Sequence, residues 1–455
     1  MDHTRKLAGF CSDLSIKELP GEVIHMAKLC VLDYIANVYG SLQLDAVERV
    51  ISYIKTIEKN GDTTVLGCDF KTSIHLAAFI NGTTAEAIEA QDGVRFGGNH
   101  PCAAVIPAAF AVAEQRNSGG GRLIEALVAG YESANRPAAA MHPWHTLSGF
   151  LPTGTCGTFG AAAAAAKLSD FTAAQMLNAI ANAGYILPIS MAEHLMGGYT
   201  IKIVQGGQAA SAGIMASGLA GAGLTGTPFV LEGSELNGGF TKITTQAEPK
   251  FNLISDDLGK KYSIMDVYFK PYTACRHTHG AAQAALELAK EKRIGPEDIE
   301  IVEVYTYGIA ELAVGKGVAE NDTFVSAQFS IPYVVAVCLS DGELGPKQLT
   351  EKRLADSNLI DLSKRIRVKT DEKLNQAYPD KTSSRIEVVL KNGELLKKQI
   401  DIPKGDPRDP MDADDIAEKV KNFSDRRDPQ KLDELIGMIL ELEKVDNVRR
   451  IIEMI

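Results

Sequence analysis

The 455-residue chain has few features that would cross-link it or carry it into a membrane. Its seven cysteines are scattered, odd in number and never spaced as CxxC, so neither a disulfide framework nor a zinc ribbon is expected. No apolar run reaches the length that a helix needs to span a bilayer. The first residues, MDHTRKLAGFCSDLS, lack the charged start and apolar core of a signal peptide. We therefore expect a cytoplasmic protein without a membrane partner.

Two further shortages, of basic and of aromatic residues, narrow the functional class. The formal net charge is −11, whereas a general nucleic-acid binder carries a basic face, so no nucleic-acid partner is expected. A site for an anion must then concentrate positive charge locally. Aromatic residues make up only 6% of the chain, and alanine-rich stretches dominate its apolar share. Such stretches favour closely packed helices.

Helical spacing prevails up to about residue 260 and then gives way to a mixed pattern. In EVIHMAKLCVLDYIANVYG, residues 22–40, apolar side chains recur with the period of a helix. Thr172 and Gln175 form a capping-box start for a later helix. After residue 266, the stretches IEIVEVYTYG, RIRVKT and SRIEVVLKNGELLKKQID are typical of strands, and Asn392-Gly393 predicts a hairpin. One helix is predicted over AQFSIPYVVAVCLSDG, residues 327–342.

The turn-rich stretch 403–415 marks a boundary, after which helical spacing returns. These last helices are too short to bury an apolar face alone, so we expect them to pack on the N-terminal helices. The sequence therefore predicts a mostly α protein. A discontinuous helical domain of residues 1–265 and 405–455 would hold a smaller α+β domain of residues 266–404.

The stretch FKPYTACRHTHG concentrates cationic and proton-carrying side chains, and three interpretations compete. Cys275, His277 and His279 would face one way in an extended segment and could bind a metal, but no second ligand cluster accompanies them. Lys270 and Arg276 could instead neutralise carboxylates, while His277 or His279 moves protons. The third interpretation is an ordinary polar loop in which His279 only caps the following helix. We favour the anion and acid/base interpretation.

Two other stretches hold candidate residues. In EAQDGVRFGGNHP, a carboxylate such as Asp92 near His100 could fix the imidazole tautomer and raise its basicity. A polar turn that caps a helix is the simpler alternative. In GGYTIKIVQGG, Lys202 lies among glycines whose amides could approach an anion. The alternative there is a surface lysine on a loop.

Seven motifs occur in order along the chain: HPCAAVIPAA, ALVAGYESANR, GFLPTGTCGTFGAAAAAAKLS, GGYTIKIVQGGQAASAG, FKPYTACRHTHGA, SAQFSIPY and PKGDPRDPM. Together they resemble the motifs of the MmgE/PrpD family, whose members include 2-methylcitrate dehydratases, cis-aconitate decarboxylases and iminodisuccinate epimerases. The resemblance implies a helical domain built from both chain ends, a smaller α/β lid, a homodimer, and no required metal or organic cofactor.

The resemblance also implies a site between the two domains. It matches Lys202 and Lys270 to family lysines and places Glu89 near the first family aspartate. It further marks Asp92, His100, Thr153, Arg276, His277 and His279. Two positions depart from the usual pattern: Gln205 stands where many members carry a histidine, and Leu151 replaces the histidine of the GFLPTG motif. His145, six residues earlier, is a possible substitute for that histidine.

The functional hypothesis is a cofactor-independent enzyme that removes a proton α to a carboxylate of a small di- or tricarboxylic acid. Elimination of a hydroxyl would make it a dehydratase, loss of CO₂ a decarboxylase, and reprotonation an epimerase. We favour the dehydratase because that chemistry is the commonest in the family. An inactive carboxylate-binding homologue and a metal-binding protein are the alternatives from other classes. Leu151 predicts poor use of 2-methylcitrate and cis-aconitate, since an apolar wall disfavours an unpaired carboxylate.

Overall fold

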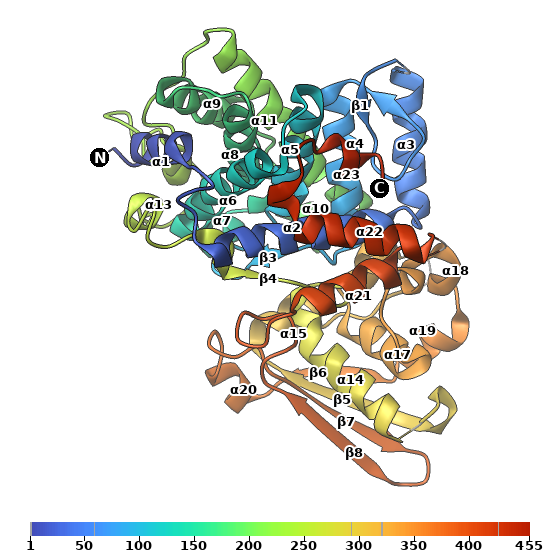
Figure 1. Ribbon diagram of the computed structural model, residues 1–455. Coiled ribbons are helices and arrows are strands. Elements are labelled where there is room, and N and C mark those ends of the chain that lie inside the picture. Colours follow the sequence, from blue (N-terminus) through green and yellow to red (C-terminus); the bar gives the residue numbers. More distant parts are fainter. Residues whose placement is uncertain (1, 59, 293, 320–321, 426) are drawn as a thin grey trace.

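The computed structural model describes residues 2–58, 60–292, 294–319, 322–425 and 427–455. Most of them lie in helices, and a four-stranded sheet occupies the lower part of Figure 1. This confirms the predicted mostly α fold with a smaller α/β part. The domain limits at residues 265 and 405 stay a prediction.

Alanine-rich α8 (Pro152–Leu168) is buried over its whole length at the centre of the helical part. It packs against α5, α6, α9 and α11, because the small side chains of residues 161–166 let these helices approach closely. The predicted capping box of Thr172 and Gln175 starts α9, which confirms it. The other longer helices of this part are α1 (His3–Asp13), α2 (Gly21–Ser41), α3 (Asp45–Ile57), α4 (Ile74–Ala87), α5 (Cys102–Arg116), α6 (Gly120–Met141), α9 (Ala173–Ile186) and α11 (Gln205–Gly221).

Short elements connect these helices. They are β1 (Thr63–Thr64), β2 (Lys71–Thr72), β3 (Gly93–Val94), α7 (Trp144–Leu147), α10 (Ala192–Met196), η1 (Thr200–Val204), α12 (Phe240–Ile243), α13 (Asn252–Ser255) and η2 (Ser263–Asp266). Among the described helices, none is both long and apolar enough to cross a bilayer.

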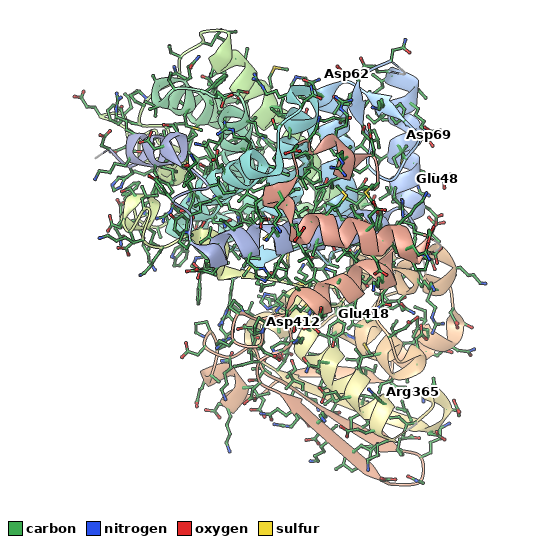
Figure 2. All side chains as sticks on the ribbon, viewed as in Figure 1. Glu48, Asp62, Asp69, Arg365, Asp412 and Glu418 are labelled. Atoms are coloured by element: carbon green, nitrogen blue, oxygen red, sulfur yellow. The ribbon has the colours of Figure 1, made fainter. Side chains whose placement is uncertain are left out.

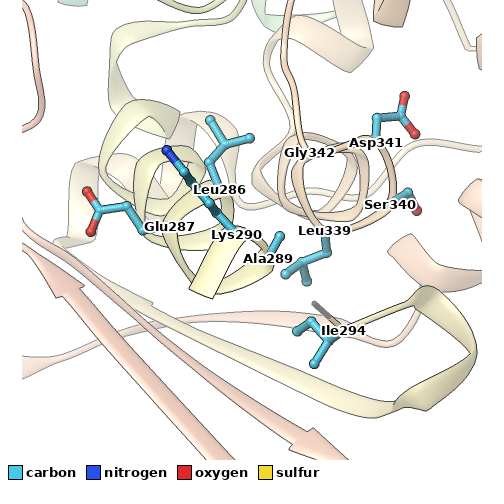
Figure 3. Close-up of a pocket in the computed structure, with 9 residues that line it drawn as sticks. All are labelled: Leu286, Glu287, Ala289, Lys290, Ile294, Leu339, Ser340, Asp341 and Gly342. Carbon is cyan, nitrogen blue, oxygen red and sulfur yellow. The ribbon is translucent and has the colours of Figure 1, made fainter. Parts of the chain in front are cut away.

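The sheet of the α/β part has the order β6-β5-β7-β8, with β5 parallel to β6 and antiparallel to β7. α14 packs on β7 and β8, and α17 on β6, so helices cover one face. An open cavity of about 480 Å³ lies between α14 and the end of α17 (Figure 3). The elements are β4 (Val267–Tyr268), η3 (Arg276–Thr278), α14 (His279–Lys292), η4 (Pro296–Asp298), β5 (Ile299–Thr306), α15 (Gly308–Val314), α16 (Phe324–Gln328), α17 (Ile331–Asp341), η5 (Pro346–Leu349), α18 (Glu351–Leu354), α19 (Ser357–Ser363), β6 (Ile366–Thr370), α20 (Glu372–Gln376), β7 (Ser384–Leu390) and β8 (Leu395–Ile400).

The turn after β7 confirms the predicted hairpin, with Gly393 at φ +88°. The prediction of one helix over residues 327–342 is wrong in one respect, because the helix is interrupted between α16 and α17. There the Ser330 hydroxyl accepts a hydrogen bond from the backbone N–H of Tyr333 and caps α17. The apolar residues on both sides of Ser330 had favoured one continuous helix.

The C-terminal helices return to the start of the chain. α21 (Ala413–Phe423) and α22 (Pro429–Leu440) pack on α2, η6 (Leu442–Lys444) on α6, and α23 (Arg449–Ile452) on α5. Asp412 and Glu418, labelled in Figure 2, mark α21 where the helical and α/β parts meet. On its buried side, Lys419 Nζ lies 2.6 Å from Asp33 Oδ1 of α2.

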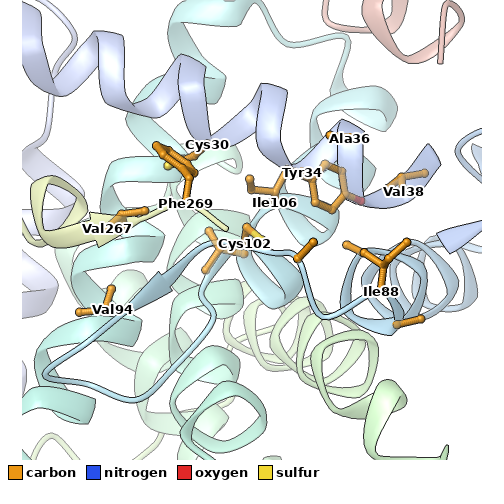
Figure 4. Packing of buried hydrophobic residues seen from close by; sticks show 14 of the residues in the cluster. Cys30, Tyr34, Ala36, Val38, Ile88, Val94, Cys102, Ile106, Val267 and Phe269 are labelled. Atoms are coloured by element: carbon orange, nitrogen blue, oxygen red, sulfur yellow. The ribbon is translucent and has the colours of Figure 1, made fainter. Parts of the chain in front are cut away.

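Two close approaches fix the place of the site. β3 pairs with β4, with Gly93 opposite Tyr268, so the 89–100 loop lies beside the start of the α/β part. Figure 4 shows Val94 and Val267 of this pair to the left of the buried Cys102 and Phe269. α4 and α11 also touch closely: a Cβ on Gly207 would lie 2.0 Å from the Phe79 carbonyl oxygen. Glycine is therefore needed at that helix contact.

Candidate active site

A buried cluster of two lysines and two glutamates lies where the helical and α/β parts meet. Lys202 Nζ is 2.8 Å from Glu86 Oε1 and 2.5 Å from Glu89 Oε2. Lys270 Nζ is 2.7 Å from Glu89 Oε1 and donates a second hydrogen bond to the Glu89 carbonyl. All four side chains are at most 2% exposed. The cluster thus joins three separate sequence motifs around one carboxylate.

The local fold explains this meeting. Glu86 lies in the last turn of α4, and Glu89 follows with φ +55°, which turns its carboxylate back towards the lysines. Lys202 lies in η1 directly before α11, and the close α4–α11 packing brings it to the glutamates. Lys270 follows β4, whose pairing with β3 places it on the other side of Glu89.

The charges of the cluster stabilise each other. Burial alone would raise the pKa of Glu89, but Lys202 and Lys270 outweigh it and hold this pKa well below its usual range. Burial likewise opposes the charge of Lys202, but Glu86 and Glu89 raise its pKa above the ordinary value. Glu89 is therefore a carboxylate and Lys202 an ammonium group at neutral pH.

His100 lies beside this cluster as a neutral base. Its Nδ1 is 2.6 Å from the backbone carbonyl of Asp92, which can only accept, so Nδ1 carries the proton and Nε2 is left with its lone pair. Nε2 is 4.0 Å from Glu89 Oε1. Burial and the charge of Lys270 lower the pKa of His100 to about 3, which keeps the ring neutral. The Thr153 hydroxyl accepts a hydrogen bond from the His100 backbone N–H and holds the loop.

The Asp92 side chain makes contacts other than the one that we expected. Its backbone carbonyl, and not its carboxylate, orients His100. The carboxylate accepts hydrogen bonds from the Tyr131 hydroxyl and from the Cys102 backbone N–H at the start of α5. Burial raises the pKa of Asp92 to about 6, although the Tyr131 hydrogen bond opposes this. These contacts make Asp92 an anchor of the loop.

The cationic segment after Lys270 forms a 3₁₀ turn and a helix start, in contrast to the extended segment considered for a metal site. Arg276 donates to the carbonyls of Pro403 and Lys404, each at 2.8 Å, and stacks over Tyr268. The His279 Nε2 lies 3.0 Å from the Ala274 carbonyl, which fixes His279 against its own loop. Within the described ranges, no group of three or more His, Cys, Asp or Glu side chains could hold a metal ion.

His277 is held differently from His279 and lies closer to solvent. Its Nδ1 is 2.6 Å from the Tyr307 hydroxyl at the end of β5. Burial and the charges of Arg276, Lys270 and Arg95 lower the pKa of His277 to about 4, so this ring is neutral too. A neutral imidazole bonded to a phenol can accept or relay a proton.

The two positions that depart from the family pattern lie at the edge of the site. The side-chain amide of Gln205 donates a hydrogen bond to the Glu86 carboxylate. The side-chain oxygen of Gln205 is buried without a hydrogen-bond partner in the described part. Leu151 is buried at the start of α8, where its backbone N–H donates to the Ser190 carbonyl. In this structure Thr155 and Thr244 engage both ring nitrogens of His145, which disfavours it as a substitute for the missing histidine.

Sequence reasoning missed three residues of this region: Glu86, Arg95 and Tyr307. A signal for Glu86 was present, since acids recur at every third position, 86, 89 and 92, through the end of α4. Tyr307 had no such signal, because only the fold of β5 brings it to His277. No side chain of the cluster lines the cavity between α14 and α17 or the cavity beside α21, although Pro271, which follows Lys270, lines the second.

The helical and α/β parts of this mostly α protein enclose a buried polar site of charged and acid/base side chains. Comparison with known sequences shows the family of such proteins to which the chain belongs. Profiles of the MmgE/PrpD N-terminal and C-terminal domains match residues 5–252 and 272–443. The chain therefore belongs to the MmgE/PrpD family.

Curated relatives cover almost the whole chain. A cis-aconitate decarboxylase of Aspergillus terreus is 25% identical over 99% of this chain and 95% of its own length. The mouse and human cis-aconitate decarboxylases are each 25% identical over 98% of this chain and over 91% and 92% of their own lengths. These relatives support an enzymatic function of the lyase type, and their names match the decarboxylase alternative rather than the favoured dehydratase.

Proposed function

We propose that the chain is a cofactor-independent lyase that forms a carbanion beside a carboxylate of a small polycarboxylic acid. Decarboxylation of an unsaturated acid chemically similar to cis-aconitate is the reaction that we favour. The observation that supports it is the buried Lys202–Glu89–Lys270 cluster with neutral His100 at its edge. Lysines in a dry site stabilise developing negative charge far more than they would in water.

In the decarboxylation, the bond between the carboxylate carbon and its neighbour breaks and CO₂ leaves. The electron pair stays on the substrate and spreads over the adjacent double bond and its carboxylate. A proton then adds to the terminal carbon of that system. Lys202 and Lys270 would bind the charged intermediate, and one of their ammonium groups, or the His277–Tyr307 pair, would supply the proton.

Substrate must compete with Glu89, because this carboxylate already occupies both lysines. We propose that a substrate carboxylate replaces Glu89 at Lys270, while Glu86 keeps Lys202 charged. The closed cluster would then be the resting state. Opening between the helical and α/β parts would admit the acid.

Dehydration of a β-hydroxy acid is the second candidate, and His100 favours it. Its Nε2 lone pair faces the cluster and could accept a proton α to a carboxylate. Leu151 bears on both candidates, because it would favour substrates with fewer carboxylates. Its predicted effect on the use of cis-aconitate and 2-methylcitrate stays a prediction.

The test is a product analysis in D₂O with cis-aconitate, 2-methylcitrate and glutaconate as substrates; glutaconate has one carboxylate fewer than cis-aconitate and also carries a carboxylate on the carbon next to its double bond. We expect CO₂ release with one deuteron added to the product, and no release by Lys202→Met. Lys444→Met, which removes an exposed lysine, serves as the matched control. Loss of water without CO₂ would instead establish the dehydratase, and inertness towards every acid would refute both. Repeating the active assay with EDTA tests the prediction that no metal is required.

A further inference from the structure

Arg95 is a cation of the site region, and its buried Nη2 has no hydrogen-bond partner among the residues that the structure describes. It follows β3 in a tight loop, where the backbone N–H groups of Gly97 and Gly98 both donate to the Val94 carbonyl. Its Nη2 is buried, and its guanidinium lies 5.1 Å from the Phe96 ring centre. Among the described lysines and arginines, Nη2 of Arg95 is the only buried side-chain nitrogen without a hydrogen bond.

Lys202, Lys270 and Arg276 are already engaged. Lys202 and Lys270 hold glutamates, and Arg276 donates to two backbone carbonyls. No described carboxylate forms an ion pair with Arg95. A buried N–H of a charged group without an acceptor is costly, so its persistence points to an acceptor that binds there during function.

The surroundings of Arg95 place it on the rim of the proposed active site. A Cβ on Gly98, three residues later, would lie 3.6 Å from His142 Nδ1, so the loop runs against that histidine. The pKa of His142 is lowered by burial and by the charges of Lys250 and Arg95. Arg95 also contributes, after burial, Arg276 and Lys270, to the low pKa of His277. Arg95 therefore lies near enough to His142 and His277 for its charge to act on both rings.

We propose that Arg95 binds a second carboxylate of the substrate, the one that the lysines do not hold. The proposal rests on the proposed function, because it assigns the far end of the same acid. A guanidinium offers two parallel N–H donors to one carboxylate, which selects for its geometry as well as its charge. Arg95 would thus set the preference for di- and tricarboxylates over monocarboxylates.

The test is calorimetric binding of cis-aconitate, citraconate and the monocarboxylate crotonate to wild type and to Arg95→Met. We expect Arg95→Met to weaken binding of the first two acids by about 10- to 100-fold, the effect of losing hydrogen bonds to a charged group. Crotonate affinity should not change. Arg450→Met, at an exposed arginine, is the matched control.

Arg95→Lys keeps the charge and guards against a folding defect. It should recover only part of the affinity, because an ammonium lacks the paired donors. Equal losses for crotonate and the polycarboxylates, unchanged affinities in Arg95→Met, or no binding of any acid by wild type would overturn the proposal. Arg95-dependent binding without turnover of any acid would refute the proposed reaction and leave the role of Arg95 standing. Turnover with an unchanged KM in Arg95→Met would refute the role of Arg95 and leave the proposed reaction standing.

Discussion

Glu89 adopts a backbone conformation, φ +55°, that residues other than glycine, asparagine and aspartate rarely adopt. Such a conformation costs about 1–2 kcal/mol for an L-residue, so the surrounding contacts must compensate for it. Lys202 and Lys270 supply that compensation through the two carboxylate oxygens. The strained residue therefore lies at the centre of the proposed chemistry.

The first prediction at this scale concerns Glu89→Gln. Lys202 keeps Glu86 as its partner, but Lys270 loses the carboxylate with which it pairs. An uncompensated buried ammonium should lower the free energy of unfolding by about 3–5 kcal/mol. A small dicarboxylate that binds Lys270 should restore part of the loss. Urea denaturation with and without the acid measures both effects.

Glu434→Gln, at an exposed glutamate of α22, is the control and should change stability little. If Glu89→Gln unfolds with the same midpoint as this control, the ion pairs of the cluster contribute nothing to stability. If the dicarboxylate fails to stabilise the variant, Lys270 is not the position at which substrate replaces Glu89.

The sequence motifs predicted which residues meet in the cluster, but not which atoms of these residues make the contacts. Lys202, Lys270 and Glu89 lie together, as the resemblance implied for an active site. The pattern Asp92–His100 suggested a carboxylate–imidazole contact, whereas the backbone carbonyl makes it. Spacing along a chain says which residues are close, but cannot say whether a side chain or its backbone faces the neighbour. Arg95 was overlooked because a lone arginine in a glycine-rich loop has no distinguishing pattern.

At the scale of elements, periodic apolar patterns and turn residues predicted α2, α9 and the β7–β8 hairpin. The same patterns did not reveal that Gly207 packs against the α4 backbone, since glycine content alone gives no partner. We expect this contact to set the position of Lys202, which lies five residues before Gly207 in the chain.

Gly207→Ala tests that contact. Its Cβ would lie 2.0 Å from the Phe79 carbonyl oxygen, so α11 must move away from α4 and carry Lys202 from the glutamates. We expect a loss of about 1–3 kcal/mol in unfolding free energy, together with reduced turnover. Thermal denaturation and the decarboxylation assay measure the two effects.

The matched control lies in the same helix. A Cβ on exposed Gly218 would meet no atom within 4 Å, so Gly218→Ala should stabilise α11 by about 0.5–1 kcal/mol. Equal behaviour of the two variants would mean that α4 and α11 tolerate separation and that Lys202 does not depend on it.

At the scale of the whole molecule, the segment of residues 185–201 in the helical part exposes many apolar side chains. Tyr185 is 93% exposed, and Ile189, Met196, Tyr199 and Ile201 are each more than half exposed. Exposed apolar side chains that are concentrated in one segment point to a site of association. We propose that this segment contributes to the homodimer that the family resemblance implies.

Analytical ultracentrifugation tests the assembly. We expect a mass twice the 48.8 kDa of the chain for wild type, and dissociation in Tyr185→Glu, because a charge in an apolar interface is costly. Leu236→Glu, at a leucine that is 90% exposed outside the segment, should remain dimeric. A monomeric wild type would refute the assembly, and a dimeric Tyr185→Glu would place its interface elsewhere.

The return of α21 to α2 has a consequence for how the protein is made. Asp33 is fully buried, and its cationic partner Lys419 lies 386 positions later in the chain. While the ribosome is still translating the middle of the message, α2 has neither that lysine nor the apolar cover of α21 and α22. The N-terminal helices should therefore stay incompletely folded until the last part of the polypeptide emerges. Nascent chains of this protein should depend on chaperones for most of their synthesis. A message truncated before the codon for Lys419 should yield a product that is degraded.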